Sequence, residues 1–498
     1  MVTYTYKAAC LSTALLLTAS PLHADTLEQA LTAAYEHNPA LQGSRDLAHA
    51  ADEGVAQARA AYGPTLNASA RHTYTTARTR GTAYPSERDG FGTSVDVTLS
   101  QPLFTSGLLA ARLDAADAAS MAERDRLRAS SQQLILDVVN AYASLQRDIQ
   151  LYGVALEIYQ LLRQQRSVIA ERYRLRDSTA PDVDQTSNRL ELAAGRVILA
   201  RSAVETSAAR YRNLVGAYPA ALAPLPALPD LPGLEALYAE AETHNPTLGA
   251  AKFTAARSRA AAGAARAQMR PQVRAFATAA RSPVSPYQNT VRQESVEAGL
   301  SLTMPLYTGG QLSSALREAS SRALADRQFA EQARRDMRET LATDWSLLQA
   351  SSEAMPRYEA AVQAAERAVD GVKTQETSGI RTLRDVLDVT NDLLNARTAA
   401  AQTRAEIYVR QVAVLRDAGL LTIDLFAQIK PYDPGSRKAG TAWLAGLPLQ
   451  PVLEPADRVF LDDRVPPEPV QRENSGAYDW VRSAGNPLQP PSGPPAAP

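Results

Sequence analysis

A two-fold internal repeat constrains the fold of this chain more than any other feature of its sequence. His37-Asn38-Pro39 returns as His244-Asn245-Pro246, 207 residues later (244 − 37). Pro102-Leu103-Phe104 returns as Pro305-Leu306-Tyr307, 203 residues later (305 − 102). An offset that changes once, by four residues, indicates a duplicated unit in which one loop of the first copy is longer. Each copy is too long for a solenoid repeat, so each is expected to form a substantial half-domain.

The first residues have the pattern of a secretory signal peptide. Lys7 precedes a mostly apolar run, and a small residue, Ala24, stands at the expected cleavage point. A membrane anchor is the weaker alternative, because the run is too short to span a bilayer. Cys10 is the only cysteine, so a chain cleaved after Ala24 would have no disulfide and no thiolate metal site. A net charge of -1 gives no basic field for nucleic acid.

Composition and repeat spacing divide the chain into five segments. They are a signal peptide (1–24), a first repeat (25–216), a linker rich in proline and alanine (217–233), a second repeat (234–426) and a proline-rich tail that is predicted to be disordered (427–498). Each repeat is predicted to contain a helix, two strands, a long helix, a turn and a further helix. The predicted strands cover about 65–80, 91–103, 272–282 and 293–306, and the long helices cover 108–176 and 311–376.

The predicted strands alternate apolar and polar residues, which is the pattern of a strand with one apolar face. Phe91, Val95 and Leu99 share one face of a strand whose other face carries Asp96 and Ser100. A length of about ten residues suits an outer-membrane strand, which needs roughly 9–11 when tilted. A half-buried antiparallel sheet in a soluble domain is the alternative. The signal peptide and the neighbouring helices favour the membrane.

The first long helix carries an apolar seam with alternating spacings of three and four residues, which predicts left-handed supercoiling. Its members are Ile135, Val138, Tyr142, Leu145, Ile149, Tyr152, Leu156 and Tyr159. The second long helix keeps part of the seam, and Pro356 predicts a kink there. The two shorter helices of each repeat, placed end to end, would match one long helix. This pattern is typical of a helical rod and not of a compact enzyme.

Four strands per chain cannot close a barrel, and lipid does not tolerate an open sheet edge. Single-chain outer-membrane barrels begin at eight strands. Closure therefore requires several identical chains, and three chains supply twelve strands. The predicted fold is mainly α with β. Four outer-membrane strands per chain form a trimeric twelve-stranded barrel, which continues as a long periplasmic α-helical barrel with an internal two-fold repeat.

Several short motifs occur in a fixed order along the chain. They are the two Asn-Pro helix openings, Gln101-Pro-Leu-Phe-Thr-Ser-Gly107, Met304-Pro-Leu-Tyr-Thr-Gly-Gly310, Gly379-Ile-Arg-Thr-Leu-Arg-Asp-Val-Leu-Asp388 and Leu393-Leu-Asn-Ala396. Over roughly residues 26–426 this ordered set resembles the TolC-type family of outer-membrane efflux and type I secretion channels. The resemblance implies a homotrimer in outer-membrane lipid that extends into the periplasm. It also implies a periplasmic adaptor and an inner-membrane ABC or proton-driven transporter as partners.

Asp385 and Asp388 are three residues apart, on one face of the helix that follows the second turn. In a trimer they would form two stacked carboxylate rings, which favour cations and make one another harder to ionise. Capping is the alternative for Asp385 and for Asp182, because Thr382 and Thr179 stand three residues earlier in a capping-box pattern. A solvated helix face is the alternative for Asp388.

The family resemblance implies that Asp385 and Asp388 form a constriction at the periplasmic entrance. It also implies a latch in which Arg381 links to the neighbouring helix pair and Asp182 belongs to the same network.

Two positions depart from the family pattern. Glu376, which we assign to the latch, stands where an aromatic residue often contributes. Arg176 stands where the repeat offset predicts a glycine like Gly379. The latch is therefore expected to have different partners in this chain.

The sequence contains no recognisable catalytic, cofactor or metal site. His37 and His244 stand beside Asn-Pro at helix breaks without a second ligand at metal spacing, which favours a structural role. No Walker-type loop and no Ser-His-Asp set stands out. We therefore expect a passive channel, not an enzyme, for the export of small molecules or proteins. A periplasmic coiled-coil adaptor or structural stalk is the alternative, and the cargo stays open between drug-like molecules and secreted proteins.

Overall fold

The structure is a computed structural model that describes residues 26–81, 86–430, 432–433 and 449–459. All of these residues belong to one compact unit, so the two repeats pack together as one body. The predicted signal peptide (1–24), most of the predicted tail (427–498) and the whole of a second unit, Asp462–Pro498, lie outside the described residues. None of the helices in the described ranges is long and apolar enough to cross a membrane.

Each repeat contains the same kinds of element in the same order, and the predicted class, mainly α with four antiparallel strands, is confirmed. The first repeat consists of α1 (Leu27–His37), α2 (Pro39–Ala60), β1 (Thr65–Thr79), β2 (Ser86–Phe104), α3 (Leu108–Arg174) and α4 (Ala180–Val215). The second consists of α5 (Leu234–His244), α6 (Pro246–Ala267), β3 (Gln272–Ser285), β4 (Gln288–Thr303), α7 (Gln311–Thr377) and α8 (Leu383–Asp417). A 3-10 turn, η1 (Ile423–Leu425), and a short helix, α9 (Gln450–Arg458), follow.

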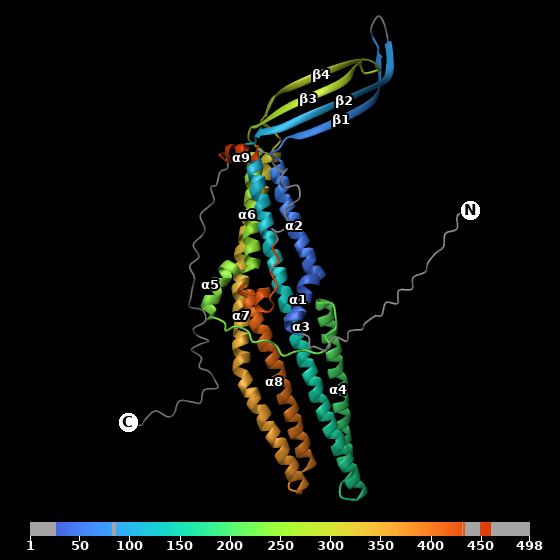
Figure 1. Cartoon of the computed structure of the whole chain (residues 1–498), viewed down its shortest axis with the longest axis vertical. Coiled ribbons are helices and arrows are strands. Elements are labelled where there is room, and N and C mark those ends of the chain that lie inside the picture. The colour runs from blue at the N-terminus through green and yellow to red at the C-terminus, as the bar shows by residue number, and fades with distance from the viewer. Residues whose placement is uncertain (1–25, 82–85, 431, 434–448, 460–498) are drawn as a thin grey trace, which may run out of the picture. The chain divides into compact units, whose positions relative to one another are not determined.

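Two long helices, α3 and α7, organise the helical part. Each has 67 residues, which gives a length of about 100 Å at 1.5 Å per residue. α2 and α4 both pack along α3, and α6 and α8 both pack along α7, so two shorter helices stand end to end beside each long one (Figure 1). α7 continues through Pro356 as one helix, and the kink predicted there stays a prediction.

An asparagine joins the two stacked helices of the first repeat. Asn38 caps α2, because its Oδ1 accepts hydrogen bonds from the amides of Ala40 (3.0 Å) and Leu41 (3.3 Å). Its Nδ2 donates to the carbonyl of Leu214 at the end of α4 (3.3 Å). Pro39 follows at the first helical position, where a backbone N–H would have no acceptor within the helix, so its absence in proline costs no hydrogen bond.

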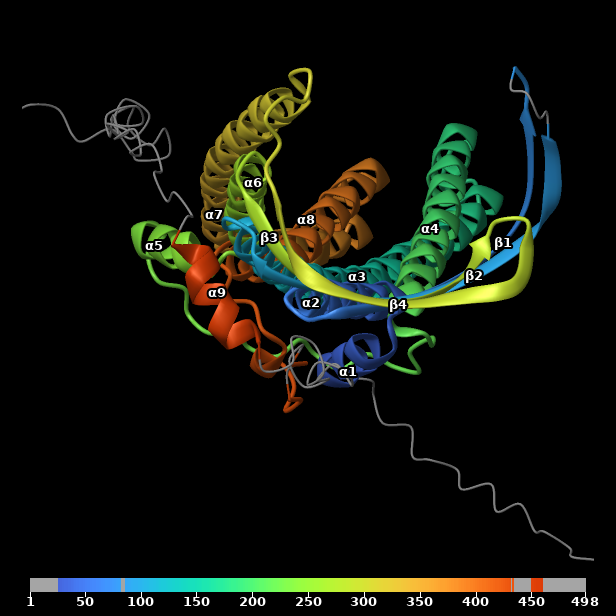
Figure 2. The ribbon, with the colours of Figure 1, turned by 90° about the horizontal axis from the view of Figure 1, so that it is seen from above.

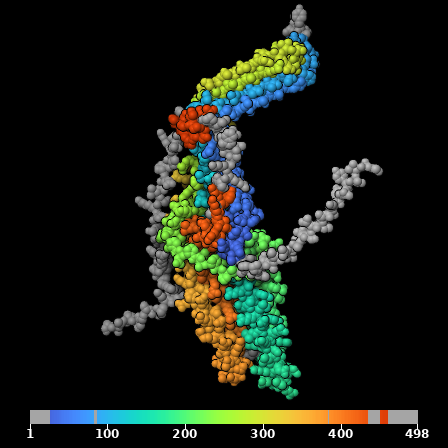
Figure 3. Space-filling view, in the orientation of Figure 1, coloured from blue at the N-terminus to red at the C-terminus, as the bar shows by residue number. Residues whose placement is uncertain are grey.

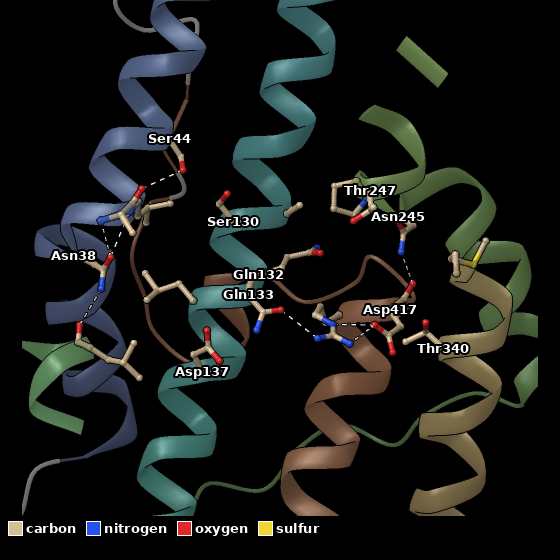
Figure 4. A pocket seen from close by; sticks show the side chains of 18 of the residues that line it. Asn38, Ser44, Ser130, Gln132, Gln133, Asp137, Asn245, Thr247, Thr340 and Asp417 are labelled. Carbon is tan, nitrogen blue, oxygen red and sulfur yellow. Dashed lines mark hydrogen bonds and ion pairs between the residues drawn. The ribbon is translucent and has the colours of Figure 1, made fainter. Parts of the chain in front are cut away.

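Asn245 makes the same junction in the second repeat. It accepts from the amide of Leu248 in α6 (2.9 Å) and donates to the carbonyl of Asp417 at the end of α8 (2.8 Å). A hollow of about 780 Å³ lies between the two junctions and is lined by both asparagines (Figure 4). The repeated His-Asn-Pro motif therefore encodes a splice between helices, and we use this name for both junctions.

The strands form one antiparallel sheet in the order β1-β2-β3-β4. Cross-strand rows on one face are apolar, as in the row Leu66, Leu99, Ala277 and Ala298 and the row Ala68, Val97, Ala279 and Val296. The row between them, on the other face, is polar and consists of Asn67, Thr98, Thr278 and Glu297. No described part of the chain covers the apolar face at Val296, which is 84% exposed. β1 and β4 are open edges of this sheet.

The strands are longer than the predicted ten residues, with 15, 19, 14 and 16 residues in chain order. β2 begins at Ser86 and β4 at Gln288, five residues before the predicted starts at 91 and 293. The end added to β2 is polar on both faces and the end added to β4 has Val291 as its one apolar residue, so the apolar–polar alternation that revealed the strands is lost there. An ion pair between Arg78 and Glu87 (2.6 Å) joins β1 to β2 in this region.

The predicted apolar seam of α3 is correct only in its first half. Ile135, Val138, Tyr142 and Leu145 are buried and pack with α1. Ile149 is 47% exposed, and the buried positions beyond it are instead Ala155, Ile158, Leu162 and Ile169. α3 changes partners along its length, from α1 and α2 to α4 and α8. A helix of 3.6 residues per turn also drifts from a strict seven-residue repeat by about 20° per heptad.

Three short helices lie on one side of the helical layer. Figure 2 shows α1, α5 and α9 on the convex side of the curved layer formed by α2, α3, α6 and α7. The turns of the α3–α4 and α7–α8 hairpins lie at the end of the helices that is remote from the sheet (Figure 1). The two hairpins end there in separate tips (Figure 3).

Candidate functional site

The two hairpin turns at the tips have the same backbone conformation. In each turn an amide donates to a carbonyl five residues earlier, Asp177 to Arg172 (2.8 Å) and Ile380 to Gln375 (2.9 Å). The residue before that amide is left-handed in both, with φ of 66° at Arg176 and 74° at Gly379. This conformation costs a non-glycine residue about 1–2 kcal/mol. Arg176 therefore adopts at a cost the turn that Gly379 adopts freely.

Asp182 and Asp385 cap the helices that follow these turns. Each carboxylate accepts from the amide of a threonine three residues earlier at 3.0 Å, Thr179 for α4 and Thr382 for α8. The hydroxyl hydrogen bond from Thr179 lowers the pKa of Asp182, and the amide hydrogen bond from Thr382 lowers the pKa of Asp385. The capping alternative is thus observed for both residues. The lowered pKa of Asp385 is opposite to the effect expected from crowding in a carboxylate ring, which stays a prediction for an assembled trimer.

Asp388 is the carboxylate that reaches across to the other hairpin. It accepts a hydrogen bond from Arg189 of α4 at 2.9 Å, and Arg384, one turn earlier in α8, lies 3.8 Å from it. Its side chain is 52% exposed. Asp388 therefore joins α8 to α4 and still presents an open side to solvent.

Of the three predicted latch residues, Glu376 makes the contact between hairpins. Its carboxylate pairs with Arg172 at 2.8 Å and joins α7 to α3. Arg381 donates to the side chain of Gln375 at 3.3 Å, within its own hairpin. Asp182 likewise bonds within its own turn. Among the described residues Arg381 and Asp182 do not meet, so of these three residues Glu376 is the one that joins the hairpins.

An apolar cluster holds the hairpins together above the tips. It consists of Ile158, Leu162, Ala193 and Leu387, from α3, α4 and α8. The Arg172–Glu376 pair lies beyond Leu162, nearer the tips. A partly exposed ion pair contributes roughly 1 kcal/mol or less, so separating the tips would cost far less than separating the cluster.

The two arginine partners, Arg172 and Arg189, were missed in the sequence. A signal for them exists, because repeat-equivalent positions of the two hairpins lie at similar heights. Opposite charges separated by about the repeat offset of 203 are therefore candidates for pairs. Arg172 and Glu376 are 204 apart, and Arg189 and Asp388 are 199 apart.

The recurring histidines contact backbone carbonyls one turn earlier in their own helices. Nδ1 of His37 lies 3.2 Å from the Ala33 carbonyl, and Nδ1 of His244 lies 3.3 Å from the Glu240 carbonyl. Within the described ranges, no three His, Cys, Asp or Glu side chains are grouped to hold a metal ion. Each histidine stands next to a splice, and its structural role stays a prediction.

A buried carboxylate stands at the second splice. Burial raises the pKa of Asp417 to about 7, against the opposing effect of Arg416, and neighbouring Asp344 adds to the rise. Arg416 lies 2.6 Å from Asp417, and Arg410 lies 2.7 Å from Asp344. This cluster joins the end of α8 to the middle of α7.

Comparison with known sequences gives matches over both repeats. The profile of the outer membrane efflux protein family matches residues 30–217 and 237–419. The outer membrane efflux protein BepC of Brucella suis is 28% identical over 429 residues, 86% of this chain and 92% of that protein. The outer membrane protein TolC of Escherichia coli is 24% identical over 413 residues, 80% and 83% of the two chains. The alkaline protease secretion protein AprF of Pseudomonas aeruginosa is 24% identical over 356 residues, 69% and 73%.

Solved structures match the fold as well. The outer membrane protein VceC of Vibrio cholerae aligns with a TM-score of 0.69 at 21% identity, and the alignment covers 79% of this chain and 96% of that one. The outer-membrane channel OprN aligns with a TM-score of 0.69 at 22% identity, over 79% and 89% of the two chains.

Proposed function

Because this chain belongs to the outer membrane efflux protein family, we propose that three copies of it form an export duct driven by an inner-membrane transporter through a periplasmic adaptor. The family consists of channel proteins and not of enzymes, and its place is the outer membrane with an extension into the periplasm. Membership sets aside the alternative of a periplasmic adaptor or stalk.

The open four-stranded sheet carries the proposal of a trimer. Its apolar face suits lipid, but at its edges β1 and β4 a row of backbone groups has no partner strand among the described residues. Such groups cost several kcal/mol each in a bilayer. Pairing β1 of one copy with β4 of the next removes both edges, and three copies give a twelve-stranded barrel.

The hairpin tips supply the constriction of the proposed duct. Three copies would bring together six carboxylates from Asp385 and Asp388 near the periplasmic entrance. Rings of carboxylates favour cations. The lowered pKa of Asp385 keeps it ionised, which supports the negative charge of such a ring.

The ion pairs between hairpins are the proposed latch. Glu376 with Arg172 and Asp388 with Arg189 hold the two hairpins of one copy together at the tips. Asp182 and Arg381 would contribute by shaping the turns on which the latch residues stand. A transporter and adaptor that pull the tips apart would first break the partly exposed Glu376–Arg172 pair, because the Asp388–Arg189 pair lies beside Leu387 of the apolar cluster.

The cargo is proposed to be small molecules or proteins. The relatives include one named for efflux and one named for the secretion of alkaline protease. Cargo movement would take its energy from the transporter, since the duct itself is passive.

The test is purification from outer membranes followed by conductance in planar bilayers. We expect a heat-sensitive trimer with cation preference, and Asp385→Ala with Asp388→Ala should reduce that preference and the block by trivalent cations. The matched control removes two exposed acidic groups away from the tips, Glu235→Ala with Asp424→Ala, and should leave selectivity unchanged. A monomer that stays inserted alone would overturn the trimer, and unaltered selectivity of the tip variant would overturn the constriction.

A further inference from the structure

α9 faces the protein with charged residues and faces outward with apolar residues, which is the reverse of an ordinary surface helix. Its charged residues Glu454 and Asp457 face the body of the protein together with Leu453, which packs on Tyr62 and its neighbours. Its exposed positions are apolar and recur at helical spacing, apart from the ion-paired Arg458. They are Pro451, Val452, Pro455, Ala456 and Val459.

Asp457 fixes this orientation at the start of α3. Its carboxylate, in a residue only 3% exposed, accepts from the amides of Thr105 and Gly107, both at 2.9 Å, and from the amide of Ala110 at 3.3 Å. The Thr105 hydroxyl also donates to it at 2.9 Å. A carboxylate at a helix N-terminus satisfies unpaired amides and opposes the positive end of the helix dipole.

A second anchor prevents α9 from rolling. Arg458 donates to both oxygens of Asp114 in α3, at 2.7 and 3.1 Å, and to Glu454 at 2.9 Å. With Asp457 and Arg458 both tied to α3, the apolar stripe must point away from the protein. Val452 is 69% exposed and Val459 is 76% exposed.

The location of α9 indicates what the stripe meets. α9 contacts β2 and α3 where the sheet gives way to the helices. It lies on the convex side (Figure 2), which is the outer side of a closed ring. A short apolar surface at the end of membrane-spanning strands would reach the boundary between lipid headgroups and acyl chains.

We propose that α9 is an interfacial lipid contact, a helix whose outward stripe rests in the periplasmic leaflet of the outer membrane at the base of the barrel. The inference rests on the proposed function, because it requires the sheet to span the membrane. The occupant is phospholipid. A neighbouring copy of the chain is the competing occupant that the test must separate from it.

The test places a fluorescent thiol probe at single sites in a Cys10→Ser background, because Cys10 is the only cysteine. Val452→Cys and Val459→Cys report on the stripe, Val97→Cys on the apolar face of the sheet, and Ala236→Cys on the exposed side of α5. Each labelled full-length protein is reconstituted in phosphatidylcholine vesicles with and without bromine on the acyl chains, and iodide is added as a quencher from water.

If α9 contacts lipid, brominated acyl chains should quench the probes at Val452→Cys and Val459→Cys, as they should quench the probe at Val97→Cys. Iodide in the water should quench only the probe at Ala236→Cys. Iodide quenching of the α9 probes, with Val97→Cys still quenched by bromine, would overturn the proposal and leave the proposed function intact. Protection from both quenchers, with excimer emission between pyrene-labelled copies, would overturn it in favour of a neighbouring chain. Failure of bromine to quench the Val97→Cys probe would overturn both the lipid contact of α9 and the proposed function.

Discussion

The two repeats share one backbone plan and place different side chains at its equivalent positions. At the hairpin turn Arg176 and Gly379 have nearly the same φ. At the splice the carbonyl that receives the asparagine belongs to Leu214 in one repeat and to Asp417 in the other. Backbone hydrogen bonds thus determine the conformation in both copies, and the side chain determines its energetic cost.

The start of the long helix also differs between the copies. α3 begins under the carboxylate of Asp457, whereas α7 begins at Gln311, and in its first turn the amide of Leu312 makes only a long hydrogen bond to the Thr308 hydroxyl (3.5 Å). Near that start Leu306 and Tyr307 are 89% and 90% exposed. The first copy is therefore capped from within its own chain, whereas the second leaves these two large side chains exposed.

Among equivalent positions of the two repeats, the largest expected difference in the effect of a mutation on stability lies in the core. Tyr142 is fully buried and donates to the Ala223 carbonyl at 2.7 Å, whereas its repeat equivalent, Trp345, is only partly buried. We expect Tyr142→Ala to lower the free energy of unfolding by about 4 kcal/mol, as for other large buried aromatics. Thermal unfolding of the detergent-solubilised protein measures it. Trp345→Ala, the matched change, should cost clearly less, and equal losses would contradict the stated asymmetry.

Removal of the α3 cap should have the next largest effect. Asp457→Ala leaves buried amides without acceptors, at a cost of about 2 kcal/mol. Thr308, the equivalent of Thr105, accepts from Leu312 at 3.5 Å, a weak bond, so Thr308→Ala should change little. Both are measured as shifts of the thermal midpoint. A neutral Asp457→Ala would show that α9 does not hold the junction.

The two splices should respond differently to pH. The pKa of Asp417 is raised from 3.8 to about 7, so the folded state keeps a proton that the unfolded state has lost. Stability should therefore fall as pH rises from about 4 to 7. Asp417→Asn should flatten this slope, whereas Leu214→Asn in the first repeat should leave it in place. The measurement is the denaturant midpoint of unfolding across this pH range. An unchanged pH dependence of the midpoint in Asp417→Asn would show that another group causes it.

The smallest effect is expected at the turns. Arg176→Gly should stabilise the first hairpin by about 1 kcal/mol, because the left-handed conformation favours glycine. Gly379→Arg should destabilise the second by a similar amount. Hydrogen exchange of the turn amides, compared between the paired variants, measures both. The two substitutions must change the stability of their hairpins in opposite directions. Changes in the same direction would refute the equivalence of the turns.

The sequence predicted those features of the fold that depend on local or periodic signals. The Asn-Pro break, the alternation around Val95 and the repeat offset each follow from neighbouring residues. The mostly polar strand ends from Ser86 and Gln288 carry no apolar–polar alternation, so their extent could not be predicted. The seam beyond Leu145 was misplaced because its burial depends on which helix lies opposite.

The candidate site was predictable as a location and not as a set of bonds. Capping by Asp182 and Asp385 is local and was anticipated. The partners of Glu376 and Asp388 come from a different hairpin, about 200 residues away, and only the three-dimensional pairing of the copies selects Arg172 and Arg189. The contact between Asp457 and Thr105 spans 352 residues and involves no repeated motif, so no pattern could reveal it.

The splices at Asn38 and Asn245 have a mechanical consequence. An unbroken helix transmits torque along its length through continuous rows of hydrogen bonds, whereas a joint bridged by one side chain can swivel. α4 and α8 end where α2 and α6 begin, so α3 and α7 alone carry unbroken rows of backbone hydrogen bonds from the sheet towards the hairpin turns. Torque between the two ends of the molecule is therefore transmitted through these two helices.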